Sequence, residues 1–321
     1  MGVGRLFSIF RRPYVPATPR PASVTVSDRH LIVRPDMLTR NGGDNINVPS
    51  MIRVPDWVER PLGRYYLYFS RHGGWPHIRL AVADDVGGPW RIHPQGTLAA
   101  SDVPGIGDFV AAPDIHVDHA RQQIRMYFHA RSNHHRRMKA MAGVSPDGLG
   151  FRVAPQVLGE FYFRAFQYRG EWFAMSKGGR LYRSPDGLSG FARGRDAFPI
   201  IPGNGRRYNA PGSVRHLAID VIGDHAEVYY SRIGDAPERI LKSHLDLTGH
   251  WRTWKAGPPE DVIRPQESWE GADLPVAPSK LGKAAMPVHQ LRDPAIFRDQ
   301  DGTRYLLYVV AGEQGIAIAR V

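Results

Sequence analysis

The sequence predicts an all-β fold, a five-bladed β-propeller whose ring is closed by an N-terminal strand that completes the last blade. One observation is a module that recurs along the chain: an inner segment, an aromatic-rich strand, a strand of small residues and an outer strand. Four-stranded repeats are typical of propeller blades. The other observation is the composition, since 34 Gly and 27 Pro favour many short strands joined by tight turns.

The strands of the five copies follow one another in the same order along the chain. We expect inner strands at residues 48–52, 112–116, 162–166, 213–219 and 293–297. The second strands are expected at residues 65–70, 124–130, 172–175, 226–231 and 305–310, and the third strands at 78–83, 139–144, 181–183, 240–245 and 315–321. Outer strands are expected at residues 90–94, 151–155, 191–193 and 251–254.

The fifth copy lacks an outer strand of its own. Residues 31–35, LIVRP, match the outer strands of the first two copies, so we expect them to fill the missing place. Closure of this kind removes the exposed sheet edges that an open array would leave. A β-sandwich is the alternative, and the regular four-strand units disfavour it.

The chain is predicted to form a mobile arm over residues 1–22 and a single propeller domain over residues 23–321. The absence of Cys excludes disulfides and thiolate catalysis. No apolar stretch reaches the roughly 18 residues of a membrane span, and the net charge of +11 is scattered without a nucleic-acid-binding motif. We therefore expect a cytoplasmic protein without nucleic-acid or membrane partners; the sequence leaves its oligomeric state open.

A pocket is expected on the propeller axis. The segments that lead into the inner strands share one face with the loops between the second and third strands. The leading segments contribute Asn47, Asp114, Arg164, Arg215, His216, Arg292 and Asp293, and the loops contribute His72, residues 133–137, Lys177, Asp235, Glu238, Arg239 and Glu313. An insertion before the fifth copy adds Trp269, Glu270 and Asp273. A sugar-binding site uses carboxylates for acid–base chemistry, polar side chains that hydrogen-bond the hydroxyl groups, and an aromatic ring that stacks on the sugar.

Each candidate also has a purely structural interpretation. An Asp in the position of Asp293 can cap a turn and pair with Arg292, and Asp235 can form an ion pair with Arg239 inside one turn. The insertion is either a lid or a cover for a sheet edge. The histidines show no helical H-x-x-x-H pair, and two Arg follow His134-His135, so neither a metal nor another cofactor is expected, although the sequence leaves a single axial ion near His216 open.

At these residues the chain resembles the five-bladed propeller glycosidases, the group of glycoside hydrolase families 43, 32, 117 and 130. The resemblance rests on Ala112-Pro113-Asp114, on the run from Arg292 to Phe297 (RDPAIF) and on the Gly88-Pro89-Trp90 turn, and it covers residues 45–321. Family 43 enzymes place an Asp base at the first blade, a second Asp at the third and a Glu acid at the fourth. Here those positions read Asn47, Arg164 and Arg215-His216, which indicates a divergent branch.

We therefore predict a glycoside hydrolase that acts on a small oligosaccharide or glycoside, and the basic rim favours an anionic one. Inversion by two carboxylates is what the family 43 resemblance implies. The predicted catalytic residues are Asp114 or Asp293 as base and Glu270 or Glu238 as acid. The predicted substrate-binding residues are Asn47, His72, His116, Arg164, His216, Asp235, Arg239, Trp269, Asp273 and Arg292. Two alternatives stay open: a non-catalytic carbohydrate-binding propeller, and a lyase acting on an acidic sugar through His or Tyr.

Overall fold

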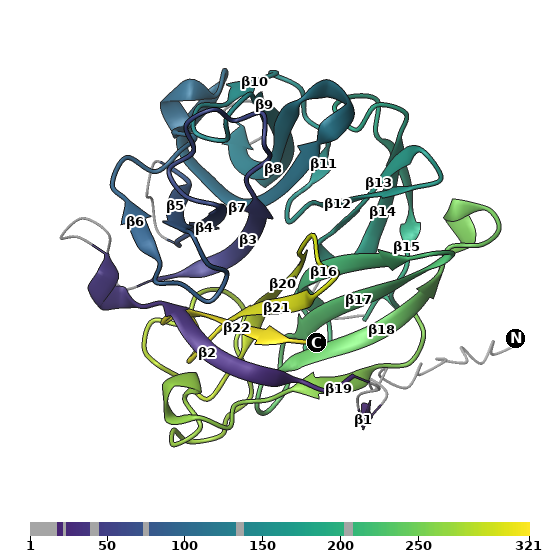
Figure 1. Cartoon of the computed structure of the whole chain (residues 1–321). Coiled ribbons are helices and arrows are strands. Elements are labelled where there is room, and N and C mark those ends of the chain that lie inside the picture. Colours follow the sequence, from purple (N-terminus) through teal and green to yellow (C-terminus); the bar gives the residue numbers. More distant parts are fainter. Residues whose placement is uncertain (1–17, 22–23, 39–44, 73–76, 133–137, 202–207) are drawn as a thin grey trace, which may run out of the picture.

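The computed structural model describes residues 18–21, 24–38, 45–72, 77–132, 138–201 and 208–321. Five sheets follow one another around a ring in sequence order (Figure 1). The prediction of an all-β, five-bladed propeller is confirmed. The predicted rim residues 133–137 and most of the predicted arm, residues 1–17 and 22, lie outside the described residues.

Except for the outer strand of the fourth blade, the blades contain the predicted strands with small shifts at their ends. The first blade consists of β3 (Asn47–Arg53), β4 (Tyr65–Ser70), β5 (Arg79–Ala83) and β6 (Arg91–His93). The second consists of β7 (Ile106–Asp118), β8 (Gln123–Ser132), β9 (Met138–Ser145) and β10 (Arg152–Val153), with β11 (Gly159–Glu160) also paired to β9. The third consists of β12 (Arg164–Tyr168), β13 (Glu171–Ser176), β14 (Arg180–Ser184) and β15 (Ala192–Asp196).

The fourth blade consists of β16 (Val214–Ile222), β17 (His225–Arg232), β18 (Ile240–Asp246) and β19 (Glu260–Ile263). The fifth consists of β20 (Arg292–Arg298), β21 (Arg304–Val309), β22 (Ile316–Arg320) and the N-terminal strand β2 (Ser27–Val33). Short 3-10 helices lie between strands: η1 (Pro35–Met37), η2 (Ala100–Asp102), η3 (His119–Arg121), η4 (Lys177–Gly179), η5 (Trp251–Thr253) and η6 (Ser268–Glu270).

Closure of the ring is achieved as the sequence predicts. Strand β2 pairs antiparallel with β22, with Leu31 opposite Ala317 and Val33 opposite Ile316. Further back along the chain, β1 (Arg20–Pro21) pairs in parallel with β19 of the fourth blade. The end of the predicted arm is thus tied to the propeller, because its backbone extends a sheet edge.

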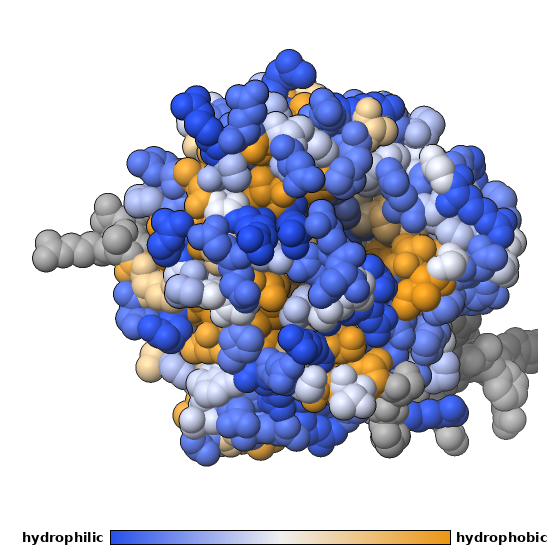
Figure 2. Space-filling view, viewed as in Figure 1, coloured by the Kyte–Doolittle hydropathy of each residue, from blue (hydrophilic) through white to orange (hydrophobic). Residues whose placement is uncertain are grey.

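The hydrophobic core is divided among the five interfaces between blades. One cluster of buried side chains fills each interface, including the interface between the first and last blades, where Leu67 and Phe69 meet Leu307 and Ile318. Aromatic rings of the second strands, such as Tyr66, Tyr127, Tyr229 and Tyr308, are among the largest fully buried side chains. In the view of Figure 2, hydrophilic side chains cover most of the surface and hydrophobic ones form small separate patches.

The predicted outer strand of the fourth blade is wrong. Residues 251–254 begin with the 3-10 helix η5, and β19 supplies the outer strand instead. Trp251 and Trp254 are both buried, and the Trp254 ring centroid lies 4.8 Å from that of Phe173 in the third blade. The two rings leave the sheet edge because they fill the interface between blades. No helix in the described part of the chain is long and apolar enough to cross a membrane.

Candidate functional site

A backbone irregularity in the inner strands positions the site. In the first, second, fourth and fifth blades the register with the second strand shifts near the start of the inner strand. Val48, Ala112 and Asp293 have left-handed φ at three of these shifts, and Tyr162 has the same φ just before the inner strand of the third blade. Such φ values are uncommon for residues other than glycine and concentrate at functional sites. The face where the inner strands begin is called the leading face below, and the face where they end is the trailing face.

Asp293 lies at the leading face with only 1% of its surface exposed. Its Oδ1 contacts Nδ1 of His216, and its Oδ2 accepts a hydrogen bond of 3.1 Å from the Val48 N–H. Burial raises the pKa of Asp293, but His216, Arg292 and the Val48 N–H outweigh this and lower it to about 2. Asp293 is therefore a fixed, ionised carboxylate beside the axis.

His216 connects this carboxylate to its surroundings. Burial lowers the pKa of His216 more than the neighbouring Asp293 raises it, so the ring is neutral near pH 7. The ring of Tyr162 lies edge-on to it at 4.0 Å between centroids. With Nδ1 facing Asp293, Nε2 has no hydrogen-bond partner among the described residues. The arrangement leaves Nε2 able to accept a proton.

A network of buried charges surrounds the dyad. Glu238 pairs with Arg215 at 2.7 Å and with Arg292 at 3.3 Å. Arg292 continues to Glu313 at 3.2 Å, and Glu313 Oε2 lies 2.8 Å from Nδ1 of His72. Glu238, Arg215, Arg292 and Glu313 thus each have an oppositely charged partner, which is the condition for stable burial of these four groups.

The same arginines fix the insertion before the fifth blade over the leading face. Arg215 donates to the carbonyls of Lys280 and Gly282 at 2.5 and 3.3 Å, and Arg292 donates to the Gly282 carbonyl at 3.2 Å. The insertion therefore contributes to the wall of the site through residues 280–282.

A cavity of about 170 Å³ opens between the insertion and the inner strands. Its wall consists of His72, Phe161, Tyr162, Lys177, Asn209, Arg215, His216, Leu281 and Gly282. Among the described residues no carboxylate lines it. Its two histidines are instead backed by carboxylates, His216 by Asp293 and His72 by Glu313. Two histidines, each backed by a carboxylate, thus line one small space.

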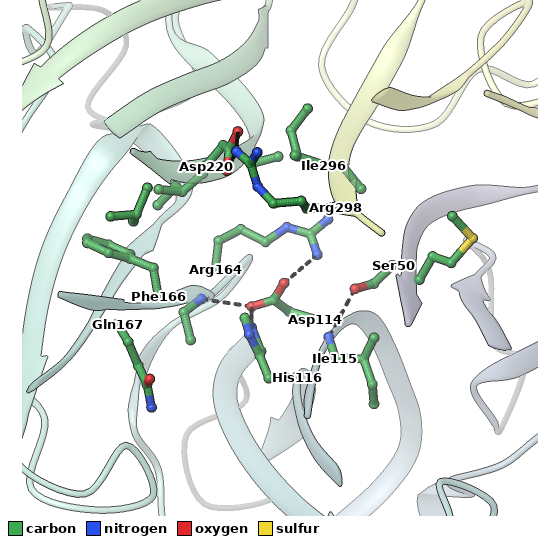
Figure 3. Close-up of a pocket in the computed structure, with 16 residues that line it drawn as sticks. Ser50, Asp114, Ile115, His116, Arg164, Phe166, Gln167, Asp220, Ile296 and Arg298 are labelled. Atoms are coloured by element: carbon green, nitrogen blue, oxygen red, sulfur yellow. Dashed lines mark hydrogen bonds and ion pairs between the residues drawn. The ribbon is translucent and has the colours of Figure 1, made fainter. Parts of the chain in front are cut away.

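A second cavity, of about 260 Å³, lies on the axis toward the trailing face. Figure 3 shows Asp114 between Arg164 and His116 in its wall. Asp114 accepts from the Ala165 N–H at 2.7 Å, Nε2 of His116 lies 2.9 Å away, and Arg164 donates at 3.2 Å. Burial raises the pKa of Asp114, but His116 and Arg164 outweigh this and lower it.

The structure separates the predicted catalytic carboxylates. Asp114 lies two residues beyond the left-handed Ala112, whereas Asp293 is itself the left-handed residue of its strand. The prediction that Asp114 and Arg164 share one rim with Asp293 is therefore wrong, and the predicted substrate-binding residue His116 lies with them in the second cavity. The leading position of the third blade is occupied by Tyr162, and Arg164 belongs to the row of Asp114. The strands predicted at residues 112–116, 162–166 and 293–297 align Ala112, Tyr162 and Asp293, so Asp114 and Arg164 lie two residues further along their strands than Asp293 does.

Other predicted site residues anchor the structure away from the axis. Glu270 is fully buried and accepts from Tyr308 at 2.8 Å, from Arg29, and from the backbone N–H of residues 266 and 267. These contacts hold the insertion against the fifth blade and leave no free oxygen for an acid beside the axis. Trp269 packs on the core between the fourth and fifth blades, and Asp273 is exposed.

In the turn from Asp235 to Arg239 the two side chains form the ion pair that the structural interpretation predicts. Asp235 pairs with Arg232 at 3.1 Å and with Arg239 at 3.3 Å, and Arg239 continues to Asp261 of the outer strand β19 at 2.6 Å. These side chains therefore point across the fourth blade rather than into the axial cavity.

The leading face brings together the remaining predicted residues: Asn47, His72, His216, Glu238, Arg292 and Asp293. Sequence reasoning missed Tyr162, Asn45 and Asn209 as members of this site. Asn45 donates to Glu313 and accepts from the His72 N–H at 2.7 Å. In the described residues no group of three or more His, Cys, Asp or Glu is arranged to hold a metal ion.

Comparison with known proteins gives one close relative. "Uncharacterized protein R118" of Acanthamoeba polyphaga mimivirus is 39% identical over 310 residues, which cover 88% of this chain and 85% of the viral protein. The chain belongs to the family of this viral protein. No family model matches the sequence.

Solved structures share the fold at low sequence identity. The GH43_1 enzyme from Xanthomonas citri complexed with xylose has a TM-score of 0.59 at 14% identity, over 90% of both chains. CoXyl43, a GH43 β-xylosidase/α-arabinofuranosidase from a compost metagenome, has a TM-score of 0.58 at 14% identity, over 94% of both chains. The endo-arabinase from Bacteroides thetaiotaomicron VPI-5482 has a TM-score of 0.58 at 14% identity, over 91% of this chain and 97% of its own. The chain thus has the five-bladed fold of these glycosidases.

Proposed function

We propose that the protein is a glycoside hydrolase that acts on a small oligosaccharide or glycoside in the leading-face cavity. The observation that carries the proposal is the His216–Asp293 pair in a cavity wall that also contains His72 backed by Glu313. The shared fold with glycosidases adds to it, although fold alone assigns no chemistry. At about 170 Å³ the cavity is smaller than the roughly 300–1,000 Å³ typical of drug-sized ligands, which favours a single sugar unit.

In the proposed reaction water attacks the anomeric carbon while the glycosidic C–O bond breaks. Neutral His216 takes a proton from the water through Nε2, and Asp293 stabilises the imidazolium that forms. Protonated His72 donates its proton to the leaving oxygen, and Glu313 fixes the orientation of its ring. The two carboxylates of the sequence prediction thus act through histidines. We propose inversion, because acid and base belong to different blades and act once each.

The test uses matched α- and β-glycosides with nitrophenyl leaving groups, followed by short natural oligosaccharides. The expected result is hydrolysis of one anomeric series, with the opposite anomer as the first product by NMR. A first product of the same anomeric configuration would reject inversion but keep the hydrolase. Release of no sugar from any glycoside would reject the hydrolase.

A lyase on an acidic sugar is the second candidate, favoured by the Tyr162 ring at 4.0 Å from His216 and by the basic groups in the wall. A lyase removes a proton next to the sugar carboxylate and expels the leaving group without water. Its product contains a new C=C bond. Ultraviolet absorbance that rises during reaction with a polyuronate would favour this candidate over hydrolysis.

A further inference from the structure

The leading-face cavity contains a buried lysine, Lys177, that has no acidic partner among the residues that the structure describes. Lys177 is 7% exposed, and its Nζ donates to Asn209 Oδ1 at 2.9 Å. No ion pair with a carboxylate is formed by Lys177 in the described part of the chain. Lys242 shows the usual arrangement, since it is fully buried and pairs with Glu227 at 2.7 Å. Lys242 thus has a carboxylate that compensates its charge, whereas the partner of Lys177 is the neutral amide of Asn209.

The surroundings hold the ammonium in place rather than neutralise it. Nζ lies 5.3 Å from the centroid of the Phe161 ring and 5.9 Å from that of Tyr162. Both rings and Asn209 line the cavity together with Lys177. Aromatic faces attract a cation without removing its charge. The ammonium is thus pre-oriented in the wall of a site where a ligand can reach it.

The electrostatics of this wall are positive. Burial, and to a smaller extent the neighbouring Arg215, lower the pKa of Lys177 to about 8. Burial, together with His216, His72 and Lys177, lowers the pKa of His129, whose ring packs against Tyr162, to about 3. A buried charge without a partner is costly, so an anion placed beside Lys177 would be bound favourably.

We propose that Lys177 and Asn209 form a subsite for an anionic group of the substrate, a carboxylate or a sulfate ester on the sugar. The inference rests on the proposed function, because it places the sugar in the same cavity. The other cations near the site cannot take this role in the same way: Arg215 and Arg292 are already paired with Glu238 and Glu313. Lys177 donates hydrogen bonds to the anion, and the amide of Asn209 orients the ammonium.

The test compares sugars that differ only in the anionic group: a uronic acid with its parent hexose, and a sulfated hexose with the same parent. Calorimetry measures the affinity of the full-length wild type and of three variants. Lys177→Met removes the charge at similar volume, Lys177→Arg keeps it, and Lys255→Met changes an exposed lysine outside the cavity as a matched control. Since Lys177→Met removes an uncompensated buried charge, its melting temperature should equal or exceed that of the wild type.

The expected result is that the wild type binds one anionic sugar at least tenfold more tightly than the parent hexose. Lys177→Met should lose about 10- to 100-fold of that affinity, as for a lost charge-assisted hydrogen bond, and bind the parent unchanged. Lys177→Arg should keep part of the preference, and Lys255→Met all of it. Which anionic sugar shows the effect distinguishes the carboxylate from the sulfate.

The outcomes separate this inference from the proposed hydrolase. Hydrolysis of neutral glycosides, with an anionic preference that is absent or unchanged in Lys177→Met, would overturn the subsite and leave the hydrolase. Lys177-dependent binding of an anionic sugar without hydrolysis would support the subsite and reject the hydrolase. A wild type that binds no sugar of either kind would overturn both.

Discussion

The two ends of the axial channel are built from the same inner strands but differ in what their charges do. At the leading face, Asp293 contacts Nδ1 of His216, which lines a cavity and whose Nε2 has no hydrogen-bond partner in the described part of the chain. At the trailing face, Asp114 uses both oxygens on His116, Arg164 and a backbone N–H. Asp293 and Asp114 differ by two positions along their inner strands. Asp293 contacts a histidine that we propose transfers protons, whereas Asp114 links the second blade to the third.

The largest expected effect is on catalysis and distinguishes the two aspartates. Asp293→Asn removes the partner that orients His216, and removal of such a proton-transfer partner typically costs about 10²–10⁴ in rate. Asp114→Asn should leave kcat within a few-fold, since Asp114 lies in the other cavity. Steady-state kinetics on the best glycoside checks both.

Stability measurements distinguish a loss of catalysis in the aspartate variants from a loss of folded protein. Asp114→Asn weakens its pairing with Arg164 and His116, so it should lower the midpoint of denaturant unfolding. If Asp114→Asn lost activity as strongly as Asp293→Asn while still folded, the functional separation of the two faces would be wrong.

The fold was predictable because its signals are local and repeated. Period-two strands such as residues 65–70 and turns such as Ser184 to Leu188 define a blade without reference to the rest of the chain. Ring closure by residues 31–33 was also predictable, because an outer strand was missing and one matching segment was left over. The positions of Trp251 and Trp254 could not be predicted in this way, because these side chains fill the interface between the third and fourth blades.

The site was predictable only in part because it depends on the inner-strand bulge. The sequence identifies Asp293, His216, His72 and Arg292 as polar residues near the axis. It does not show where the left-handed residue falls, and a shift of two residues moves a side chain along the channel to the other cavity. Glu270 carries no local sign that it faces Arg29, which is 241 positions away.

Removing one arginine from each end should expose the difference in stability. Arg292→Met leaves Glu238 and Glu313 buried with fewer compensating charges, and breaking a buried pair typically costs about 3–5 kcal/mol. Arg298 is 44% exposed in its side chain and shares Asp220 with Arg304, so Arg298→Met should cost less than about 1 kcal/mol. Equal losses in chemical denaturation would contradict this contrast.

A pH dependence should come from the leading-face end. The pKa of His129 is lowered from 6.5 to about 3 by burial and by neighbouring cations, so below pH 6.5 the unfolded chain binds a proton that the folded protein does not. The free energy of unfolding should therefore fall as pH decreases from about 6.5 to about 3, by up to about 1.4 kcal/mol per pH unit for one proton.

His129→Phe tests this origin, because it keeps a ring that packs against Phe109 and Phe161. The variant should lose stability less steeply between pH 6.5 and 3 than the wild type does. Parallel curves for the two proteins would show that the acid sensitivity arises elsewhere.

The smallest expected effect concerns the backbone at the bulge. Ala112 has a φ of 55° at the leading end of β7, where an L-residue with a Cβ is strained by roughly 1–2 kcal/mol relative to glycine. Ala165, on β12 beside Asp114, is similarly buried but lies outside the set of left-handed residues, so it serves as the matched control. Ala165→Gly should destabilise by about 0.5–1 kcal/mol, since glycine only adds freedom to the unfolded chain there. Ala112→Gly incurs the same loss but also relieves the strained φ, so it should be neutral or slightly stabilising. Denaturant midpoints that fall equally for both variants would mean that the bulge stores no strain and that only the side chains distinguish the two ends of the channel.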